Sequence, residues 1–146
     1  MHTVRQLAKR VLWVVASALT VLFAGYSSSV LSNEIKVVLS GDQEIPPLQS
    51  AASGTGTITV GADKSISATV AVSGMTVTVA HIHEAPPDRN GPIVIPLVKV
   101  SENTWSVQPG VVLTDSQYES YKAGNLYFNI HSALHRAGEI RGRIKP

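Results

Sequence analysis

Hydrophobic and polar residues alternate in short runs along most of the chain after about residue 34. Alternation with a period of two places successive side chains on opposite faces of a β-strand. Paired prolines and clusters of Gly, Asn and Asp separate these runs and mark turns. The pattern predicts eight strands, at residues 35–39, 53–60, 65–72, 75–83, 93–100, 104–107, 126–131 and 139–144.

One stretch, residues 113–124, has helical character instead. Thr114 is suited to be its N-cap, Lys122 lies where a cation favours the end of a helix, and Gly124 is suited to stop it. Short strands with turns every eight to twelve residues or so favour an antiparallel β-sandwich with Greek-key-like connections. We therefore predict an all-β fold of about eight strands with one short helix.

The alternation also assigns the histidines to a face of the sheet. His81 and His83 alternate with apolar neighbours, so both take the outer face of their strand, about 7 Å apart. His131 takes the outer face of a later strand by the same parity, and His135 follows four residues on, past the strand end. Three or four neutral imidazoles from two neighbouring strands form a ligand set suited to copper or zinc. The sequence thus predicts a metal site on an outer face, covered by loops.

For each histidine alone, the alternative is an ordinary solvated surface residue. However, four of the five histidines of the chain lie in two short segments. Unrelated surface residues would not gather in this way, so we favour a shared metal site. The chain has no cysteine, which excludes thiolate ligands and leaves nitrogen and oxygen to hold the metal.

Residues 1–33 predict export. Arg5, Lys9 and Arg10 precede an uncharged apolar run at residues 11–25, which is the layout of a secretory signal peptide. This run is shorter than the roughly 20 residues that a spanning helix needs, although its extension would make an uncleaved membrane anchor. In either case residues 34–146 form one domain, expected in the periplasm or outside the cell.

The net charge excludes one class of partner. The chain carries 12 Lys and Arg against 10 Asp and Glu, a net charge of +2, and three of the basic residues lie in the first ten positions. The remaining nine basic residues nearly balance the ten acidic ones. We therefore exclude nucleic acid, and expect membrane contact only through an uncleaved N-terminal segment. The sequence does not determine the oligomeric state.

Four segments, at residues 39–47, 81–94, 123–131 and 138–142, together span nearly all of the exported region. In this order they resemble the signature blocks of the chordin-type domain, CHRD. The resemblance implies a domain of the kind found in bacterial secreted proteins. It also implies an alternative function, that of a non-catalytic extracellular interaction module, which is the role suggested by chordin.

The His-x-His pair and the later histidines are also similar to the ligands of copper/zinc superoxide dismutases. That resemblance implies that His81 and His83 are paired copper ligands. It implies further ligands at His131 and His135, and a role for Arg141 as the cation that guides superoxide to the copper. The loop after the pair lacks the zinc-binding histidines of those enzymes, and their intersheet disulfide is absent, so the implied site holds copper alone.

Three functions therefore remain open. The domain is an exported copper-binding protein, a redox enzyme of dismutase type that uses the same site, or an interaction module without catalysis. Nucleophilic catalysis is excluded, because no Ser or Cys lies in a nucleophile-elbow motif. We favour copper as the metal, with zinc bound more weakly, according to the usual order of affinities.

Overall fold

The computed structural model describes residues 33–146, which belong to one compact unit. Its strands are β1 (Ile35–Ser40), β2 (Ser53–Val60), β3 (Ile66–Ser73), β4 (Val77–Glu84), β5 (Ile93–Ser101), β6 (Thr104–Ser106), β7 (Leu126–Ser132) and β8 (Ile140–Arg143). A short 3-10 helix, η1 (Gly41–Gln43), and one α-helix, α1 (Asp115–Lys122), complete the elements. The prediction of an all-β fold with eight strands and one short α-helix is confirmed.

The predicted signal peptide or membrane anchor lies outside the described residues, apart from position 33. Within the part of the chain that the structure describes, no helix has the length and apolar character needed to cross a membrane.

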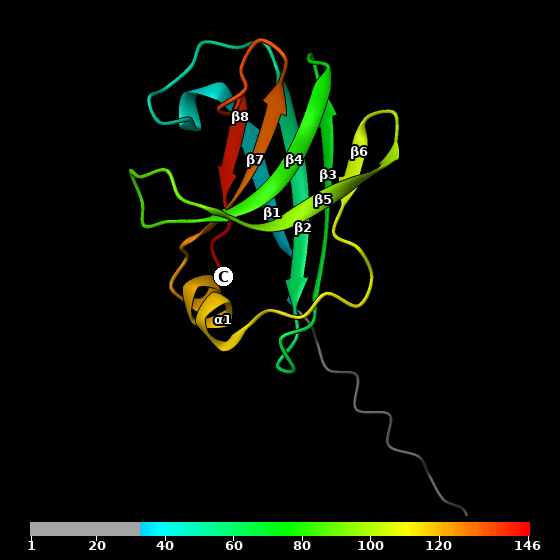
Figure 1. Cartoon of the computed structure of the whole chain (residues 1–146), viewed down its shortest axis with the longest axis vertical. Coiled ribbons are helices and arrows are strands. Elements are labelled where there is room, and N and C mark those ends of the chain that lie inside the picture. Colours follow the sequence, from blue (N-terminus) through cyan, green and yellow to red (C-terminus); the bar gives the residue numbers. More distant parts are fainter. Residues whose placement is uncertain (1–32) are drawn as a thin grey trace, which may run out of the picture. The chain divides into compact units, whose positions relative to one another are not determined.

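The strands close into an antiparallel barrel rather than the two-layer sandwich that the sequence predicted (Figure 1). Their order around the barrel is β1-β2-β3-β6-β5-β4-β7-β8. β8 closes the barrel because it pairs on both sides, with Arg141 opposite Asn129 of β7 and opposite Ser40 of β1. Closure removes free strand edges, which would otherwise be open to pairing with other chains. Within the barrel, β7, β4, β5 and β6 lie side by side in the order of a Greek key.

Local sequence explains where the helix begins and ends. Thr114 accepts a hydrogen bond from the backbone N–H of Gln117, and the Gln117 side chain accepts one from the backbone N–H of Thr114. This reciprocal capping box satisfies two backbone donors at the start of α1. Gly124 follows the helix with a φ of 71°, a left-handed conformation that glycine adopts without strain. The predicted N-cap and stop are both confirmed.

Inward-pointing side chains fill the barrel. Several large ones have no more than 1% of their surface exposed: Leu39, Ile58, Val70, Ile82, Phe128, Ile130, Ile140 and Ile144. Full burial of one such side chain stabilises the fold by about 1.5–3 kcal/mol. A shift of one residue along a strand would turn its core side chains outward. Burial of these side chains therefore fixes which residues of each strand face the core and which face outward.

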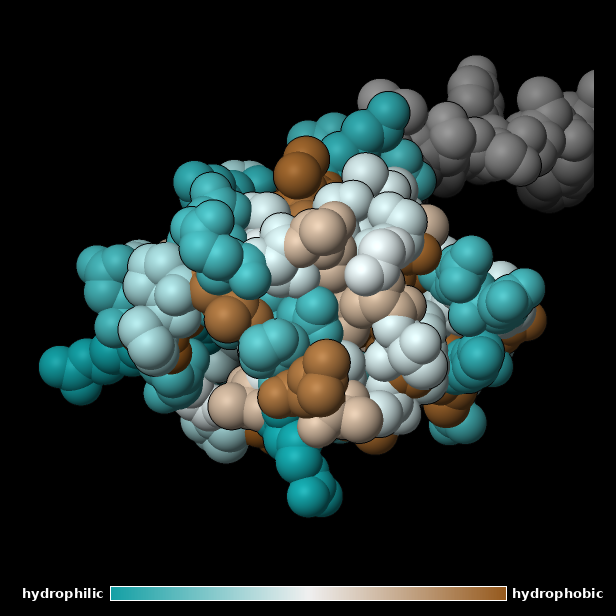
Figure 2. Space-filling view, turned by 90° about the horizontal axis from the view of Figure 1, so that it is seen from above, coloured by the Kyte–Doolittle hydropathy of each residue, from teal (hydrophilic) through white to brown (hydrophobic). Residues whose placement is uncertain are grey.

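The outer face of β4, β7 and β8 is covered by loops. All seven residues of β7 are buried, although alternate ones point away from the core. Two segments lie against this face: the β4–β5 loop, residues 85–92, and the β7–β8 loop, residues 133–139. The β7–β8 loop and η1 lie at the end of the barrel opposite α1 (Figure 1). Seen from that end, apolar residues form separate spots among polar ones (Figure 2).

Candidate metal site

The pairing of β4 with β7 brings three histidines together. His81 is opposite Asn129 and His83 is opposite Tyr127. His131, two residues after Asn129, is therefore a diagonal neighbour of His81 on the same face. The ring centroids are 5.0 Å apart for His81 and His131, 5.5 Å for His81 and His83, and 5.8 Å for His83 and His131. The three imidazoles form one group.

The ring nitrogens of this group are spaced for a shared ion. One nitrogen from each ring lies within 4.8 Å of the other two, and His81 Nδ1 is 3.2 Å from His131 Nε2. Two nitrogens bound to a metal at about 2.0–2.1 Å, at angles of about 90–110°, are about 2.9–3.4 Å apart. The closest pair already has this spacing, and the ring nitrogen of His83 lies within 4.8 Å of both. The group can hold a metal ion.

Backbone carbonyls fix the tautomer of two of the three imidazoles. His83 Nδ1 donates to the carbonyl oxygen of Gly91 at 2.9 Å, and His131 Nδ1 donates to that of Arg136 at 3.0 Å. A carbonyl oxygen only accepts, so in each neutral ring Nδ1 carries the proton and Nε2 presents a lone pair. Histidines that bind metals usually have their other ring nitrogen held in this way.

The Nε2 atom of His83 is buried and has no hydrogen-bond partner among the described residues. The whole residue is only 8% exposed. Leaving a buried polar atom without a partner costs about 1–3 kcal/mol. A histidine that merely stabilised the fold would be expected to satisfy this nitrogen, whereas a metal ligand needs it free.

Burial keeps the three imidazoles neutral. It lowers the pKa of His81 to about 4, with smaller contributions from the neighbouring His131 and His83. Burial also lowers the pKa of His83 and of His131, against an opposing effect of the carbonyls that accept from them. At neutral pH a metal therefore would not have to displace a proton from an imidazolium ion.

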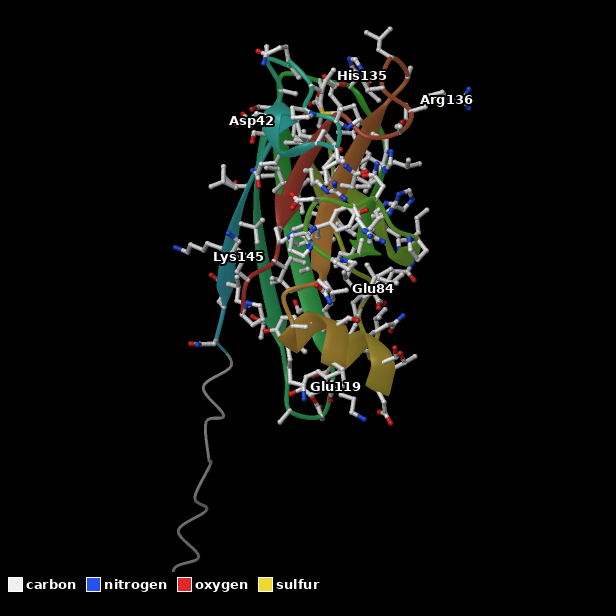
Figure 3. The ribbon with its side chains drawn as sticks, turned by 90° about the vertical axis from the view of Figure 1, so that its left-hand side faces the viewer. Asp42, Glu84, Glu119, His135, Arg136 and Lys145 are labelled. Atoms are coloured by element: carbon white, nitrogen blue, oxygen red, sulfur yellow. The ribbon has the colours of Figure 1, made fainter. Side chains whose placement is uncertain are left out.

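His135, the fourth predicted ligand, is not part of this group. It lies in the β7–β8 loop, at the end of the barrel opposite Glu119 of α1 (Figure 3). Its backbone shapes the loop instead: its N–H donates to Ser132 Oγ at 3.1 Å and its carbonyl accepts from Gly138 at 3.1 Å. These bonds hold the turn that presents the carbonyl of Arg136 to His131.

Arg141, the predicted guide for anions, lies on the outer face of β8 as its parity required. It is nevertheless only 3% exposed. Its guanidinium donates to Asn90 Oδ1 at 3.2 Å and to the Arg89 carbonyl at 3.0 Å, both in the β4–β5 loop. It therefore lies beneath that loop and is not presented to solvent.

Sequence reasoning missed three contributors to the site: the carbonyls of Gly91 and Arg136, and the ring of Tyr127. Tyr127 stacks on His83 with centroids 5.2 Å apart and planes at 18°, and its hydroxyl accepts from the Gly91 N–H at 3.0 Å. Parity gave a signal for Tyr127, which shares the outer face of β7 with His131. The carbonyls gave none, because every residue has one and only the path of the loop selects which is used.

Comparison with known families gives a match to the CHRD domain over residues 35–144. Comparisons with curated proteins and with solved structures gave no match. The matched region contains all eight strands of the described residues, the three grouped histidines and the two loops whose carbonyls accept hydrogen bonds from His83 and His131. The chain therefore belongs to the CHRD-domain family.

Proposed function

We propose that this CHRD domain binds one copper ion per chain through His81, His83 and His131. The observation that carries the proposal is the buried Nε2 of His83, which lacks a partner among the described residues and belongs to a group of three converging ring nitrogens. A metal ion would satisfy that lone pair. Two fixed tautomers and three neutral rings add support, because they prepare the group for a cation.

The donor atoms support copper over zinc. The group consists of three imidazoles without a carboxylate, and the chain offers no thiolate. For a given set of nitrogen ligands, Cu(II) binds more tightly than Zn(II). We therefore expect zinc to compete, but with a lower affinity.

The three histidines would have different roles in binding the metal. His83 and His131 are buried and already present Nε2, whereas His81 is partly exposed. In the metal-free protein His131 Nε2 can only accept, so His81 Nδ1 must be the donor in the 3.2 Å contact between them. To become a ligand through Nδ1, His81 has only to transfer this proton to its other ring nitrogen. His81 is thus the adjustable ligand of the set.

We propose that the domain stores or handles copper outside the cytoplasm. Membership of the CHRD family supports this location. The basic and apolar pattern of residues 1–33, which predicts a signal peptide or an anchor, supports it as well. A domain without cysteine is also suited to an oxidising compartment, since it has no thiol to lose.

A redox activity of dismutase type has narrower support. Three protein ligands would leave a coordination position for a small molecule, as a copper enzyme requires. Arg141, however, is buried beneath the β4–β5 loop, so attraction of superoxide by its exposed guanidinium is not supported. Superoxide consumption by copper-loaded protein, with a chelator present to remove free metal, tests this activity. Activity that persists with the chelator and disappears in His83→Ala would establish it.

Copper binding is tested by loading the purified domain with Cu(II), desalting it and measuring metal per chain. We expect one equivalent, with nitrogen hyperfine structure in the electron paramagnetic resonance spectrum. His83→Ala should lose this signal, whereas His135→Ala, which changes a histidine outside the group, should keep it. Protein that retains no copper, or a spectrum of oxygen ligands alone, would refute the proposal and favour the interaction module.

A further inference from the structure

Arg141 ties the β4–β5 loop to the outer face of β8. Besides its hydrogen bonds to Asn90 and Arg89, its guanidinium carbon lies 3.6 Å from the ring centroid of Tyr127, a cation–π contact. No carboxylate of the described residues lies within ion-pairing distance of it. A buried cation is costly unless its surroundings compensate it. The loop and the tyrosine ring supply the hydrogen bonds and the ring contact that keep Arg141 in place, and the nearby buried carboxylate of Glu44 adds electrostatic attraction.

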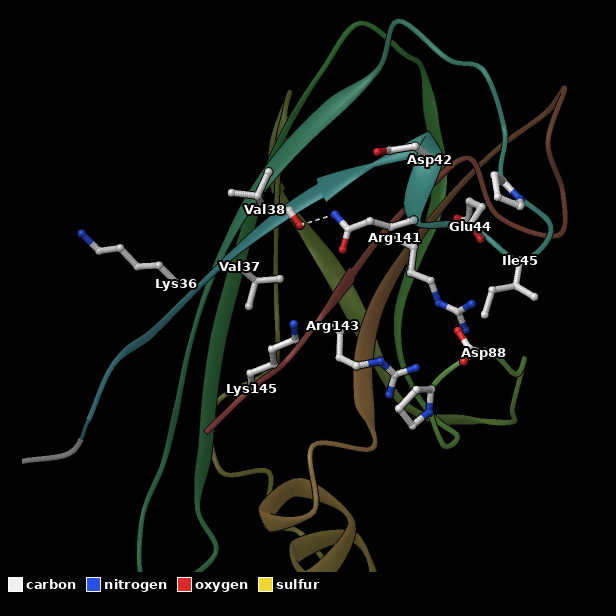
Figure 4. A pocket seen from close by; sticks show the side chains of 13 residues that line it. Lys36, Val37, Val38, Asp42, Glu44, Ile45, Asp88, Arg141, Arg143 and Lys145 are labelled. Carbon is white, nitrogen blue, oxygen red and sulfur yellow. Dashed lines mark hydrogen bonds between the residues drawn. The ribbon is translucent and has the colours of Figure 1, made fainter.

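Arg143 holds the beginning of the same loop. Its Nη1 donates to the carbonyl of Ala85 at 2.9 Å and to that of Gly124 at 3.1 Å, and its Nη2 donates to that of Pro86 at 3.3 Å. Figure 4 shows Arg141 and Arg143 reaching from β8 toward the loop that carries Asp88. The two arginines thus fasten the loop at both ends.

The fastened loop ends at the group that orients His83. Gly91 follows directly after Asn90, and its carbonyl accepts from His83 Nδ1 while its N–H donates to the Tyr127 hydroxyl. The backbone is packed so closely here that a Cβ on Gly91 would lie 1.8 Å from the carbonyl oxygen of Glu84. The position of the Gly91 carbonyl therefore depends on how the loop is docked.

Tyr127 connects the two sides of this arrangement. One face of its ring contacts the Arg141 guanidinium, and the ring also stacks on the imidazole of His83. Its hydroxyl bonds to the same Gly91 residue whose carbonyl holds His83. Arg141 can therefore act on His83 by two routes, through the loop and through the tyrosine ring, without contacting the imidazole itself.

We infer that Arg141 and Tyr127 are positioning residues that fix Nε2 of His83 as the metal-binding nitrogen. When the loop is released, the Gly91 carbonyl no longer holds the proton on Nδ1. The ring can then rotate, or take the tautomer that directs an N–H toward the other two imidazoles. A ring in that state cannot donate a lone pair from Nε2. This inference rests on the proposed function, in that the group is a metal site.

Arg141→Met tests the inference, because methionine keeps the long apolar stem but removes the charge and both hydrogen bonds. The matched control is Lys36→Met, which removes one positive charge from the same hollow between β1 and β8, where Lys36 points away from the loop (Figure 4). The first readout is the tautomer of His83 in metal-free protein, from the ¹⁵N chemical shifts of its ring. The second is the dissociation constant for Cu(II).

In the wild type and in Lys36→Met we expect one tautomer at His83, protonated at Nδ1. In Arg141→Met we expect a mixture of tautomers and a Cu(II) affinity about 10–100-fold lower, the usual loss when a group behind a metal ligand is removed. An Arg141→Met variant that keeps the single tautomer and binds Cu(II) within twofold of the wild type would overturn the inference.

If Arg141→Met does not fold, Asn90→Ala carries the test. Asn90 is exposed, and its replacement removes one of the two hydrogen bonds that Arg141 makes to the loop, together with the bond from Asn90 Nδ2 to the Ile45 carbonyl at 2.8 Å. We expect the same change of tautomer to a smaller extent, and an unchanged His83 spectrum would overturn the inference. Because the tautomer is read without metal, the two proposals separate. Wild-type protein that does not bind Cu(II) refutes the proposed function, while altered tautomers in the variants still support the positioning role.

Discussion

The stabilisation of this domain by copper should depend on His131 and not on His135. His131 supplies one of the three nitrogens of the group. Structural zinc sites with four ligands have binding free energies of about 10–16 kcal/mol, or roughly 3 kcal/mol for each ligand. Loss of one nitrogen in His131→Ala should therefore weaken the affinity for Cu(II) by a factor of about 100 or more.

Thermal unfolding measures this loss. With free Cu(II) at about 100 times the wild-type dissociation constant, binding stabilises the wild type by about 2.7 kcal/mol. A variant with 100-fold weaker binding gains only about 0.4 kcal/mol under the same conditions. In a domain of this size, 1 kcal/mol changes Tm by about 4–6 °C. Copper should thus raise the Tm of the wild type by roughly 10–15 °C and that of His131→Ala by about 2 °C.

The variant must be compared with its own metal-free form. His131 is 6% exposed and donates to the Arg136 carbonyl, so its removal also destabilises the metal-free domain, by about 1–3 kcal/mol. His135→Ala is the control and should keep the full copper-induced rise. An equal rise in His131→Ala and in the wild type, or loss of the rise in His135→Ala, would refute the assignment of ligands.

Three further changes test the fold and the electrostatics. Ile82→Asp places a charge in the barrel core, where Ile82 is 0% exposed, and should lower the free energy of unfolding by several kcal/mol. A melting curve like that of the wild type would contradict the assigned strand faces. Metal-free protein should lose stability as the pH falls from about 6.5 to about 4. In this range His81 takes up a proton in the unfolded chain, where its pKa is about 6.5, but not in the folded domain, where its pKa is about 4. Urea unfolding measured across this pH range tests the expectation, and the stability of His81→Gln should decline less steeply with falling pH. Thr114→Ala removes the N-cap of α1 and should lower stability by about 1 kcal/mol in thermal unfolding while Cu(II) affinity stays unchanged.

The sequence by itself determined the strands, the helix and the face that each strand turns outward. Alternation with a period of two is a local property, so the position of Ile82 in the core and of His81 and His83 on the outside follows from their immediate neighbours. The ends of α1 were equally local, because Thr114 and Gly124 act within one turn of the helix. The CHRD family was also evident from four short segments of the sequence.

The tertiary structure alone decided how these elements close and which outward residues meet. The barrel closes because β8 pairs with β1 as well as with the preceding strand β7, and the β1–β8 pairing joins opposite ends of the domain's sequence, which no local pattern specifies. The register of β4 with β7 placed His131 beside His81, and the path of the β7–β8 loop put His135 elsewhere. Arg141 is buried because its partner Asn90, 51 residues away in sequence, belongs to a loop folded over it. Parity assigns a side chain to the outer face, but only the packing of distant segments determines whether that face is open to water.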